Sequence, residues 1–517
     1  MNERVLPTLL ALFLAAFLPA QDDDEKFRQK QADELHDFAE DALKRGFPRQ
    51  AKLIWLQLLK LYAPDHEEAH AALGEIRVGN SWAPDPDFEY PTEDTGSGSD
   101  GQKLFKAFEK LRDKLAKNHK KQAERWAKAG RTDRTNHHWQ MVLRWRKDDE
   151  DAQEALEHKE IGGVTGTDLE QTLYDRSKLI EAAVNEEASK DYDVEVVSEK
   201  SEILDIAQVP YISVRSEHFL LFGDPDQEEF LLQGLVWAER TLRVVQRVFP
   251  WQAQVRGKFA YFVAKDTYKQ ILRANASRVP DLEWKLENTS TSGIGDIVVG
   301  NTGAVQVLYD ALVRNVAQSY SGFGSTGFSE GIGHTFVGMM FNNNRLFSVD
   351  LKRQEGTVAS EEDREFQSPN FDVWKTLALE MAWQQTGRVD AVDLPFCTAD
   401  DFSNEQRIKA WSFTDYVMRR DPQLLRALDQ LGQQFRAANR RAPLDLAAQF
   451  EEETGVTVAQ LDKEWEDFWT EATPVLAAIR NNTPPLEAVS PKVQLLANRA
   501  LTRLTNSPAI DTAPSFS

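Results

Sequence analysis

A short sequence unit occurs twice in the first third of the chain, and this duplication constrains how the region can fold. The first copy covers 46–79 and the second covers 130–163, and Trp55 of the first copy aligns with Trp139 of the second. Each copy reads as a helix, an acidic turn and a second helix with alanine and leucine along one face. A helical hairpin with one apolar face cannot bury that face alone, so we expect both copies to pack against other helices.

Each copy resembles a tetratricopeptide-type helical hairpin, a repeat that is stable only when it stacks on its neighbours. The resemblance implies an all-helical region over 26–160. Between the copies, the segment 92–101 (TEDTGSGSDG) has the composition of a flexible linker. The segment 103–125 is very polar, and we expect it to form an exposed helix.

The sequence pattern changes after the helical region. Residues 161–208 are polar and acidic, and we expect them to form a connector. Three short apolar runs then predict strands, at 218–223, 258–264 and 295–301. Amphipathic helices separate the first runs, and the chain is mainly helical from about 304 onward. Strands followed by helices within one block indicate an α+β domain over 209–475.

The two ends of the chain read as segments outside the folded regions. In 1–20, Arg4 precedes an apolar run and Ala20 precedes a polar acidic stretch, which is typical of a secretory signal peptide. That run is too short for a comfortable membrane span, and no later segment is apolar for long enough. The segment 476–517 is rich in proline and is expected to be a tail. We therefore expect a secreted or periplasmic protein with no membrane span once the signal is removed.

Charge and cysteine content exclude several classes of site and partner. The formal net charge of -22 argues against nucleic acid and anionic membrane surfaces, which are bound by basic patches. Cys397 is the single cysteine, so the chain can form no intrachain disulfide and no cysteine-based metal site.

The string HEEAH at 66–70 matches the H-E-x-x-H signature of zincin metallopeptidases, in which two histidines bind zinc and the glutamate activates water. Its context points elsewhere, because Pro64 and Asp65 signal a turn immediately before it and the second copy of the unit has no histidine at the matching place. We expect His66 and His70 to lie on the solvated face of a repeat's second helix. An adventitious surface zinc site at these histidines is the alternative.

The segment 305–338 (VQVLYDALVRNVAQSYSGFGSTGFSEGIGHTFVG) reads as a long helix, a glycine-rich turn and a second helix opened by FSEG. It resembles the gluzincin branch of zinc metallopeptidases, in particular peptidase-MA-like domains of exported bacterial proteins. That family carries H-E-x-x-H on the first helix and W-L-x-E-G-x-A-x-Y on the second. On this pattern, Glu330 matches the third zinc ligand, whereas the His, Glu and His positions hold Arg314, Asn315 and Gln318.

These replacements remove the family's chemistry. Arginine is a permanent cation, asparagine cannot take a proton from water and glutamine is a poor zinc ligand. We expect an ion pair between Arg314 and Glu330, flanked by Asn315 and Gln318, to fill the place of the zinc. The alternative places Arg314 on the exposed face of an amphipathic helix. Glu330 and His334 are one turn apart and form a weak candidate for a two-ligand metal site.

The resemblances imply an exported, non-catalytic, gluzincin-like protein, a pseudopeptidase, that binds protein or peptide segments and needs no cofactor. The first alternative is an active zinc-dependent metallopeptidase with non-standard ligands, and the second is a tetratricopeptide-type assembly scaffold. The sequence leaves the oligomeric state open.

Overall fold

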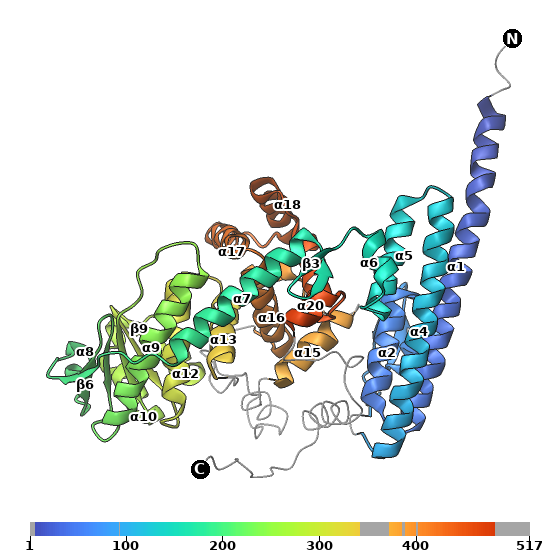
Figure 1. The fold of residues 1–517 in the computed structure, drawn as a ribbon. Coiled ribbons are helices and arrows are strands. Elements are labelled where there is room, and N and C mark those ends of the chain that lie inside the picture. The colour runs from blue at the N-terminus through green and yellow to red at the C-terminus, as the bar shows by residue number, and fades with distance from the viewer. Residues whose placement is uncertain (1–5, 92–93, 342–371, 385–387, 400–401, 481–517) are drawn as a thin grey trace.

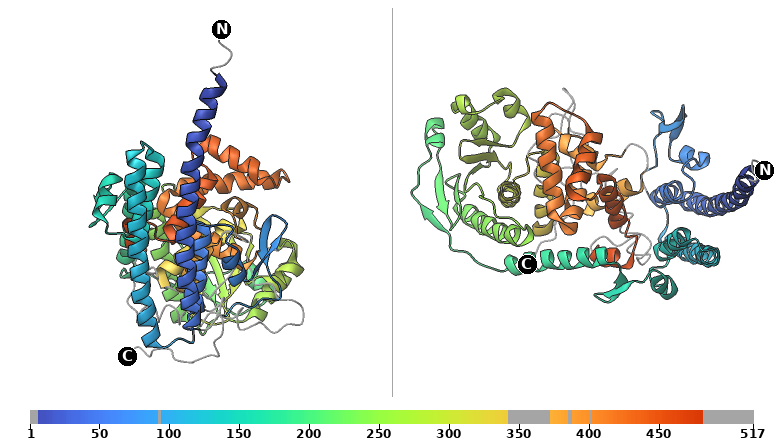
Figure 2. Two further views of the ribbon diagram at one scale, coloured as in Figure 1. Left: turned by 90° about the vertical axis from the view of Figure 1, so that its right-hand side faces the viewer. Right: turned by 90° about the horizontal axis from the view of Figure 1, so that it is seen from above.

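The computed structural model describes the chain except residues 1–5, 92–93, 342–371, 385–387, 400–401 and 481–517. The side chains of 6–23 and 372–373 also lie outside the description. The fold is α+β: most of it is helical, with one six-stranded sheet and two small hairpins. In Figures 1 and 2 the N-terminal helices stand at one end, the six-stranded sheet stands at the other, and the C-terminal helices lie between them.

The N-terminal region repeats one structural order twice: a long helix, a second helix, a short helix and a β-hairpin. The first set is α1 (Leu6–Lys44), α2 (Pro48–Leu61), α3 (Glu67–Ala72), β1 (Glu75–Val78) and β2 (Ser81–Pro84). The second set is α4 (Gly98–Lys128), α5 (Thr132–Trp145), α6 (Glu150–Ala155), β3 (Lys159–Ile161) and β4 (Val164–Gly166). The aligned Trp55 and Trp139 are both buried in the core shared by these helices. The duplicated unit therefore corresponds to a duplicated structure.

Three details of this region differ from the sequence expectation. The short helices α3 and α6, which follow the acidic turn of each unit, have only six residues each and lead into hairpins, so the region is not all-helical. The segment 92–101 is not wholly a linker, because α4 begins at Gly98 and the carbonyl of Gly46 accepts hydrogen bonds from the amides of Thr95 and Gly96. The helix expected to be exposed over 103–125 belongs to α4, whose apolar stripe, including Leu115, is buried.

The segment 161–208 is not a connector. It contains α7 (Asp168–Ala188), β5 (Glu195–Val197) and α8 (Glu202–Ala207). The sequence of α7 looks polar because only one stripe of the helix is apolar, but that stripe enters the main core through Leu173, Ile180 and Ala183. In Figure 1, α7 runs beside the C-terminal helices from the β3 hairpin toward the sheet.

The six-stranded sheet has the strand order β5-β6-β7-β8-β10-β9. Its remaining strands are β6 (Ile212–Arg215), β7 (Leu220–Gly223), β8 (Lys258–Phe262), β9 (Thr291–Ile294) and β10 (Ile297–Asn301). The central strands β7, β8 and β10 are parallel, and the outer pairings β5–β6, β6–β7 and β9–β10 are antiparallel. The three strands predicted from apolar runs are β7, β8 and β10, and their high apolar content reflects burial on both faces.

Helices cover both faces of this sheet. One face packs on α9 (Glu228–Val248) and α12 (Val307–Ser321), with Leu221 and Phe259 pointing into the larger core. The opposite face packs on α8, α10 (Lys265–Ala274) and α11 (Leu282–Asn288), with Phe222 and Ala260 in a smaller core. The alternation of β7 residues between the two cores is the period-two geometry of a strand. The larger core continues into the C-terminal helices.

The C-terminal helices surround α13 (Thr326–Phe341), which is almost entirely buried. The others are α15 (Asp372–Trp383), the 3-10 helix η2 (Ala391–Phe396), α16 (Asn404–Arg420), α17 (Pro422–Ala437), α18 (Pro443–Thr454), α19 (Val458–Trp469) and α20 (Pro474–Ile479). Ser403 forms a capping box with Gln406 at the start of α16, and Gly322 ends α12 in the left-handed conformation. These signals fix where the helices around the candidate site begin and end.

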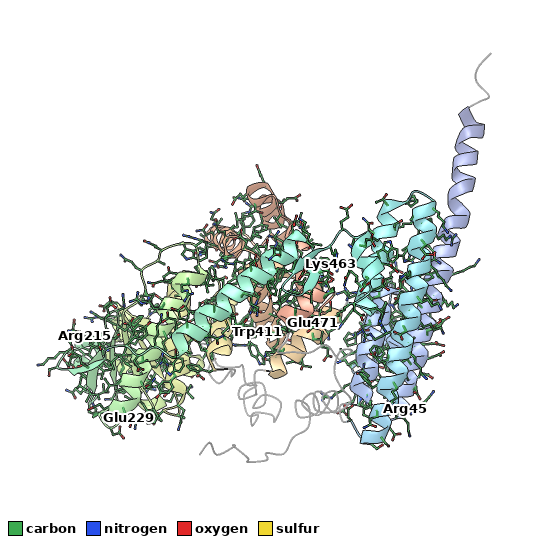
Figure 3. The ribbon with its side chains drawn as sticks, in the orientation of Figure 1. Arg45, Arg215, Glu229, Trp411, Lys463 and Glu471 are labelled. Carbon is green, nitrogen blue, oxygen red and sulfur yellow. The ribbon has the colours of Figure 1, made fainter. Side chains whose placement is uncertain are left out.

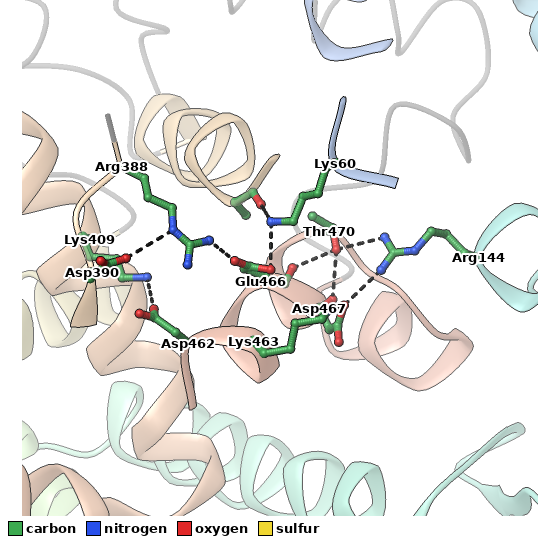
Figure 4. Close-up of polar contacts among 11 residues, drawn as sticks. Lys60, Arg144, Arg388, Asp390, Lys409, Asp462, Lys463, Glu466, Asp467 and Thr470 are labelled. Atoms are coloured by element: carbon green, nitrogen blue, oxygen red, sulfur yellow. Dashed lines mark hydrogen bonds and ion pairs between the residues drawn. The ribbon is translucent and has the colours of Figure 1, made fainter. Parts of the chain in front are cut away.

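Ion pairs join the N-terminal region to the C-terminal helices (Figure 4). Lys60 on α2 lies 2.8 Å from Oε2 of Glu466 on α19, and Arg388 contacts the other oxygen of the same carboxylate. Arg144 on α5 lies 3.0 Å from Asp467. Buried apolar contacts between α2 and Trp383 support the same junction. The two regions are therefore docked rather than merely tethered.

Two expectations fall on residues outside the description. These are the start of the expected signal peptide, residues 1–5, and the part of the expected tail that follows Arg480; the rest of the signal peptide forms the beginning of α1, without described side chains. Among the described residues, no helix combines the length and the apolar character that crossing a membrane requires.

Candidate functional site

A cluster of charged side chains lies buried where α12, α13 and α16 meet. Arg314 comes from α12, Glu330 and His334 come from α13, and Arg407 comes from α16. None of these four residues is more than 3% exposed. Charged groups are rarely buried without partners, because the loss of hydration must be offset by pairing. The cluster is therefore the candidate site.

Glu330 is the common partner of the cluster. Its Oε2 atom forms an ion pair with Nη2 of Arg314, and it lies 3.7 Å from Nη1 of Arg407 and 3.6 Å from Nε2 of His334. Burial by itself raises the pKa of this carboxyl group, but Arg314, His334 and Arg407 together hold the pKa well below its usual value. Glu330 is therefore an ionised carboxylate at neutral pH.

His334 is the neutral member of the cluster. Burial lowers its pKa to about 4, and the charge of Arg314 acts in the same direction, although the neighbouring Glu330 opposes both effects. The indole ring of Trp374 lies against the imidazole, with the ring centroids 4.8 Å apart. A neutral histidine beside an ionised glutamate is the protonation pattern that a metal ion requires. Here, however, the carboxylate oxygen nearest to His334 is already in contact with a guanidinium group.

Glycines allow the three helices to approach closely enough for these contacts. A Cβ atom added to Gly333 would lie 2.7 Å from Cγ of Arg314, so any larger residue would push α12 away from α13. A Cβ atom added to Gly331 would lie 2.5 Å from the carbonyl oxygen of Ala410 on α16. The glycines of the FSEGIGH segment are thus explained by helix packing.

The three positions that the gluzincin resemblance assigns to His, Glu and His do not share one direction. Arg314 and Gln318 face α13, where Nε2 of Gln318 donates a hydrogen bond to the carbonyl of Ser329 at 2.9 Å. Asn315 faces the sheet, where its Nδ2 donates to the hydroxyl of Tyr261 on β8 at 2.5 Å. The expected Arg314–Glu330 ion pair is present, and the alternative of an exposed Arg314 is wrong.

The histidines of the HEEAH string do not lie together on a solvated helix face. His66 precedes the helix as the N-cap of α3, and its Nδ1 accepts a hydrogen bond from the amide of Ala69. His70 is buried: one ring nitrogen contacts Glu75, the other lies 2.7 Å from the carbonyl of Pro64, and the ring stacks on Trp82. Because the helix is so short, His66 lies outside it, and the two rings cannot form a zincin site. The expectation of two solvated histidines is therefore corrected.

Two groups of histidine and glutamate side chains within the described residues bring their ligand atoms close enough to hold a metal ion. The first combines His36 on α1 with His66 and Glu68 of the HEEAH string. Nδ1 of His36 accepts a hydrogen bond from the indole of Trp55, and Nδ1 of His66 accepts one from a backbone amide. Since Nδ1 accepts in both rings, a neutral imidazole carries its proton on Nε2, and a protonated nitrogen cannot bind a metal ion. A histidine that binds a metal through one nitrogen donates a hydrogen bond from the other, which is the reverse of what Nδ1 does here. The hydrogen bonds seen here therefore oppose metal binding.

The second group consists of Glu217, His218 and Glu239. Nδ1 of His218 lies 2.9 Å from Oε2 of Glu239, while Oε1 of Glu239 accepts hydrogen bonds from the hydroxyl of Ser216 and the amide of His218. Glu217 is paired with Arg243 at 3.0 Å. This arrangement leaves only Nε2 of His218 ready to act as a ligand. The group holds the β6–β7 turn to α9.

One member of the buried cluster, Arg407, and the ring that packs on His334, Trp374, were not identified from the sequence. Arg407 follows an N-terminal capping signal and reads as an exposed helix residue, and Trp374 is one of thirteen tryptophans. A weak signal exists for Arg407, because it is followed by the largely apolar stretch IKAWSFTDYVM on the same helix. Only the packing of α16 on α13 shows that its guanidinium group points toward Glu330.

Comparisons of the chain with protein-family models, with curated proteins and with solved structures found no match.

Proposed function

We propose that the chain is an exported, non-catalytic relative of gluzincin peptidases that binds protein or peptide segments. The observation that carries this proposal is the buried ion pair between Arg314 and Glu330. Glu330 stands where the family pattern has its third zinc ligand, and Arg314 stands where the pattern has its first. A fixed guanidinium group beside this carboxylate supplies the positive charge that a zinc ion would supply in an active relative.

The remaining side chains at the site support the absence of peptidase chemistry. The position of the general base holds Asn315, whose amide hydrogen-bonds to Tyr261 and cannot accept a proton from water. Gln318, at the position of the second histidine, is engaged with the backbone of α13. The position that supplies the general base in the family pattern therefore offers no group that can take a proton from water.

The order of elements also supports the proposal. The strand–helix–strand series β7, α9 and β8 precedes α12 and α13, which is the order that the resemblance implies. The N-terminal region contributes two copies of a helical unit, a type of surface that the tetratricopeptide resemblance associates with peptide binding.

Metal analysis and a peptidase assay on the purified full-length protein test the non-catalytic part of the proposal. We expect substoichiometric zinc, no cleavage of a casein substrate and no change in either value for Glu330→Gln. Stoichiometric zinc that is lost in Glu330→Gln would overturn the proposal in favour of an active metallopeptidase with non-standard ligands. Zinc lost only in His36→Gln would instead assign metal to the group of His36, His66 and Glu68.

Retention of a random peptide pool on the immobilised full-length protein tests the binding part. We expect saturable retention of a subset of peptides. The scaffold alternative is favoured by the ion pairs that dock the N-terminal region on the C-terminal helices, since docking fixes the geometry of a rigid assembly surface. The scaffold alternative predicts that short peptides are not retained and that folded partner proteins are captured.

A further inference from the structure

A cavity of about 560 Å³ lies beside the candidate site, outside the buried cluster. Its walls come from α7, α13, α15, α16, α19 and the end of α20. Trp411 on α16, which is labelled in Figure 3, forms part of the wall. Thr335 and Gly338 place the cavity one turn along α13 from His334. The volume is sufficient for a ligand of one or two amino-acid residues.

Arg480 enters this cavity with an unusual set of neighbours. The residue is 9% exposed, and its guanidinium carbon lies 3.5 Å from the ring centroid of Trp469 and 5.4 Å from that of Phe468. Among the residues that the structure describes, no carboxylate forms an ion pair with Arg480, and its Nε atom has no hydrogen-bond partner. The nearby carboxylate of Asp415 is engaged instead by Arg419, at 2.9 Å.

A buried guanidinium group without an anionic partner is costly, because stacking on aromatic rings replaces only part of its lost hydration. Burial accordingly lowers the pKa of Arg480 to about 10, despite the attraction of Glu471 and Asp415. The hydroxyl of Ser177, which also lines the cavity, is buried without a hydrogen-bond partner in the described part of the chain. Two polar groups in one cavity therefore lack partners that a bound anion would supply.

The charge of the lining is opposite to that of the whole protein. Lys178, Lys375, Arg419 and Arg480 provide four cations, whereas Glu181 and Asp415 provide two carboxylates. The chain as a whole has a formal net charge of -22. This local excess of positive charge in an acidic protein favours an anionic ligand over a neutral or cationic one.

Apolar side chains form another part of the lining, beside neutral polar ones such as Ser177 and Asn185. Ile180, Val184 and Met339 face the cavity together with Trp411 and Phe468. An anion that carries an apolar group next to its charged end would contact both the cations and the apolar part of these walls. A guanidinium group that is stacked through its face keeps its edge for hydrogen bonds, and that edge matches the planar fork of a carboxylate.

We propose that this cavity binds the C-terminal residue of a peptide, with the carboxylate on Arg480 and the apolar side chain against Trp411 and Phe468. The proposal rests on the proposed function of peptide binding and specifies which part of the peptide is recognised. Peptide amides lack the charge, and inorganic phosphate lacks the apolar group. Both should therefore bind much more weakly than the free acid.

Calorimetric titration of the full-length protein with N-acetyl-leucyl-phenylalanine and with its C-terminal amide tests the proposal. We expect the acid to bind at least tenfold more tightly than the amide, and Arg480→Gln to reduce this preference to less than twofold. Arg440→Gln, at an exposed arginine on the loop after α17, is the matched control and should keep the preference. Val184→Trp, which fills the cavity and leaves Arg480 in place, should weaken binding of the acid at least tenfold.

Equal affinity for acid and amide in the wild-type protein would overturn the proposal, as would an unchanged preference in Arg480→Gln. Absence of binding for both probes, or displacement of the acid by inorganic phosphate at equal concentration, would also overturn it. If circular dichroism shows that Arg480→Gln is unfolded, Val184→Trp becomes the test of the proposal. Unchanged affinity of that variant for the acid would contradict the proposal. The proposed function survives each of these failures if the random peptide pool is still retained.

Discussion

Arg314 on α12 and Glu330 on α13 form an ion pair in which neither side chain is more than 4% exposed. Arg407 from α16 approaches the same carboxylate oxygen, so two cations from different helices converge on one anion. Removal of one member leaves an uncompensated charge in the core, whereas an exposed pair loses little. Together with Arg407, the pair thus links three helices through electrostatics as well as through packing.

Arg314→Ala is expected to lower the free energy of unfolding by about 3–5 kcal/mol, because Glu330 loses its closest partner in a buried site. Arg278→Ala is the matched control in the same half of the chain, since Arg278 is exposed and pairs with the exposed Glu202. That change should lower stability by about 0.2–1 kcal/mol. Thermal and urea unfolding measure both values, and equal melting temperatures for the two variants would contradict the structural role of the pair.

Gly333→Ala tests the close approach of α12 and α13. The added methyl group would meet Cγ of Arg314 at 2.7 Å, so the helices must separate, and we expect a loss of about 1–3 kcal/mol. Gly98→Ala is the control, because nothing lies within 4 Å of the added atom at the start of α4 and its φ is not positive. The control should leave stability unchanged or raise it slightly. If Gly333→Ala leaves the free energy of unfolding unchanged, the close contact between α12 and α13 at this position is contradicted.

Glu466→Gln should weaken the docking of the N-terminal region. The carboxylate pairs with Lys60 from α2 and with Arg388, so its neutralisation leaves two cations facing each other in a half-buried junction. We expect the free energy of local opening in α2 to fall by about 3 kcal/mol, measured by native-state hydrogen exchange. Asp445→Asn, at an exposed ion pair with Arg440, is the control and should leave exchange in α2 unchanged.

The stability of the N-terminal region should fall as the pH falls from about 6.5 to about 4. Burial lowers the pKa of His138 to about 4, and the charges of His137 and Arg134 add to this effect while Asp24 opposes it. A histidine in the unfolded chain has a pKa near 6.5, so in this window the unfolded state binds the proton first and acid favours unfolding. Stability contributed by His138 is fully present above pH 6.5.

Urea unfolding at several pH values checks this slope. His138→Gln removes the titrating group and should flatten the dependence between pH 6.5 and 4, although it also removes a hydrogen-bond partner of His119. His137→Gln leaves that hydrogen bond intact and should flatten the slope less. Stability that rises on acidification would contradict the assigned sign.

Much of the local structure was predictable because it depends on short-range patterns. The apolar runs at β7, β8 and β10 and the amphipathic stretch of α9 correspond to observed elements, and the duplicated unit corresponds to two similar helical sets. The Arg314–Glu330 pair was also predictable, because the gluzincin resemblance placed the two residues at ligand positions of one site and their opposite charges favour an ion pair. In contrast, α7 was missed because its apolar stripe is narrow and its polar residues dominate the composition.

The sequence by itself determined the duplicated unit, the strands β7, β8 and β10 and the helical character of the chain after about 304, and the gluzincin resemblance paired Glu330 with Arg314. Only the tertiary structure decided that Arg407 joins this pair, that His70 is buried rather than solvated, and that Arg480 faces a cavity. The physical reason is that periodicity and propensity act over a few residues, whereas burial and pairing depend on which distant element packs against each side chain.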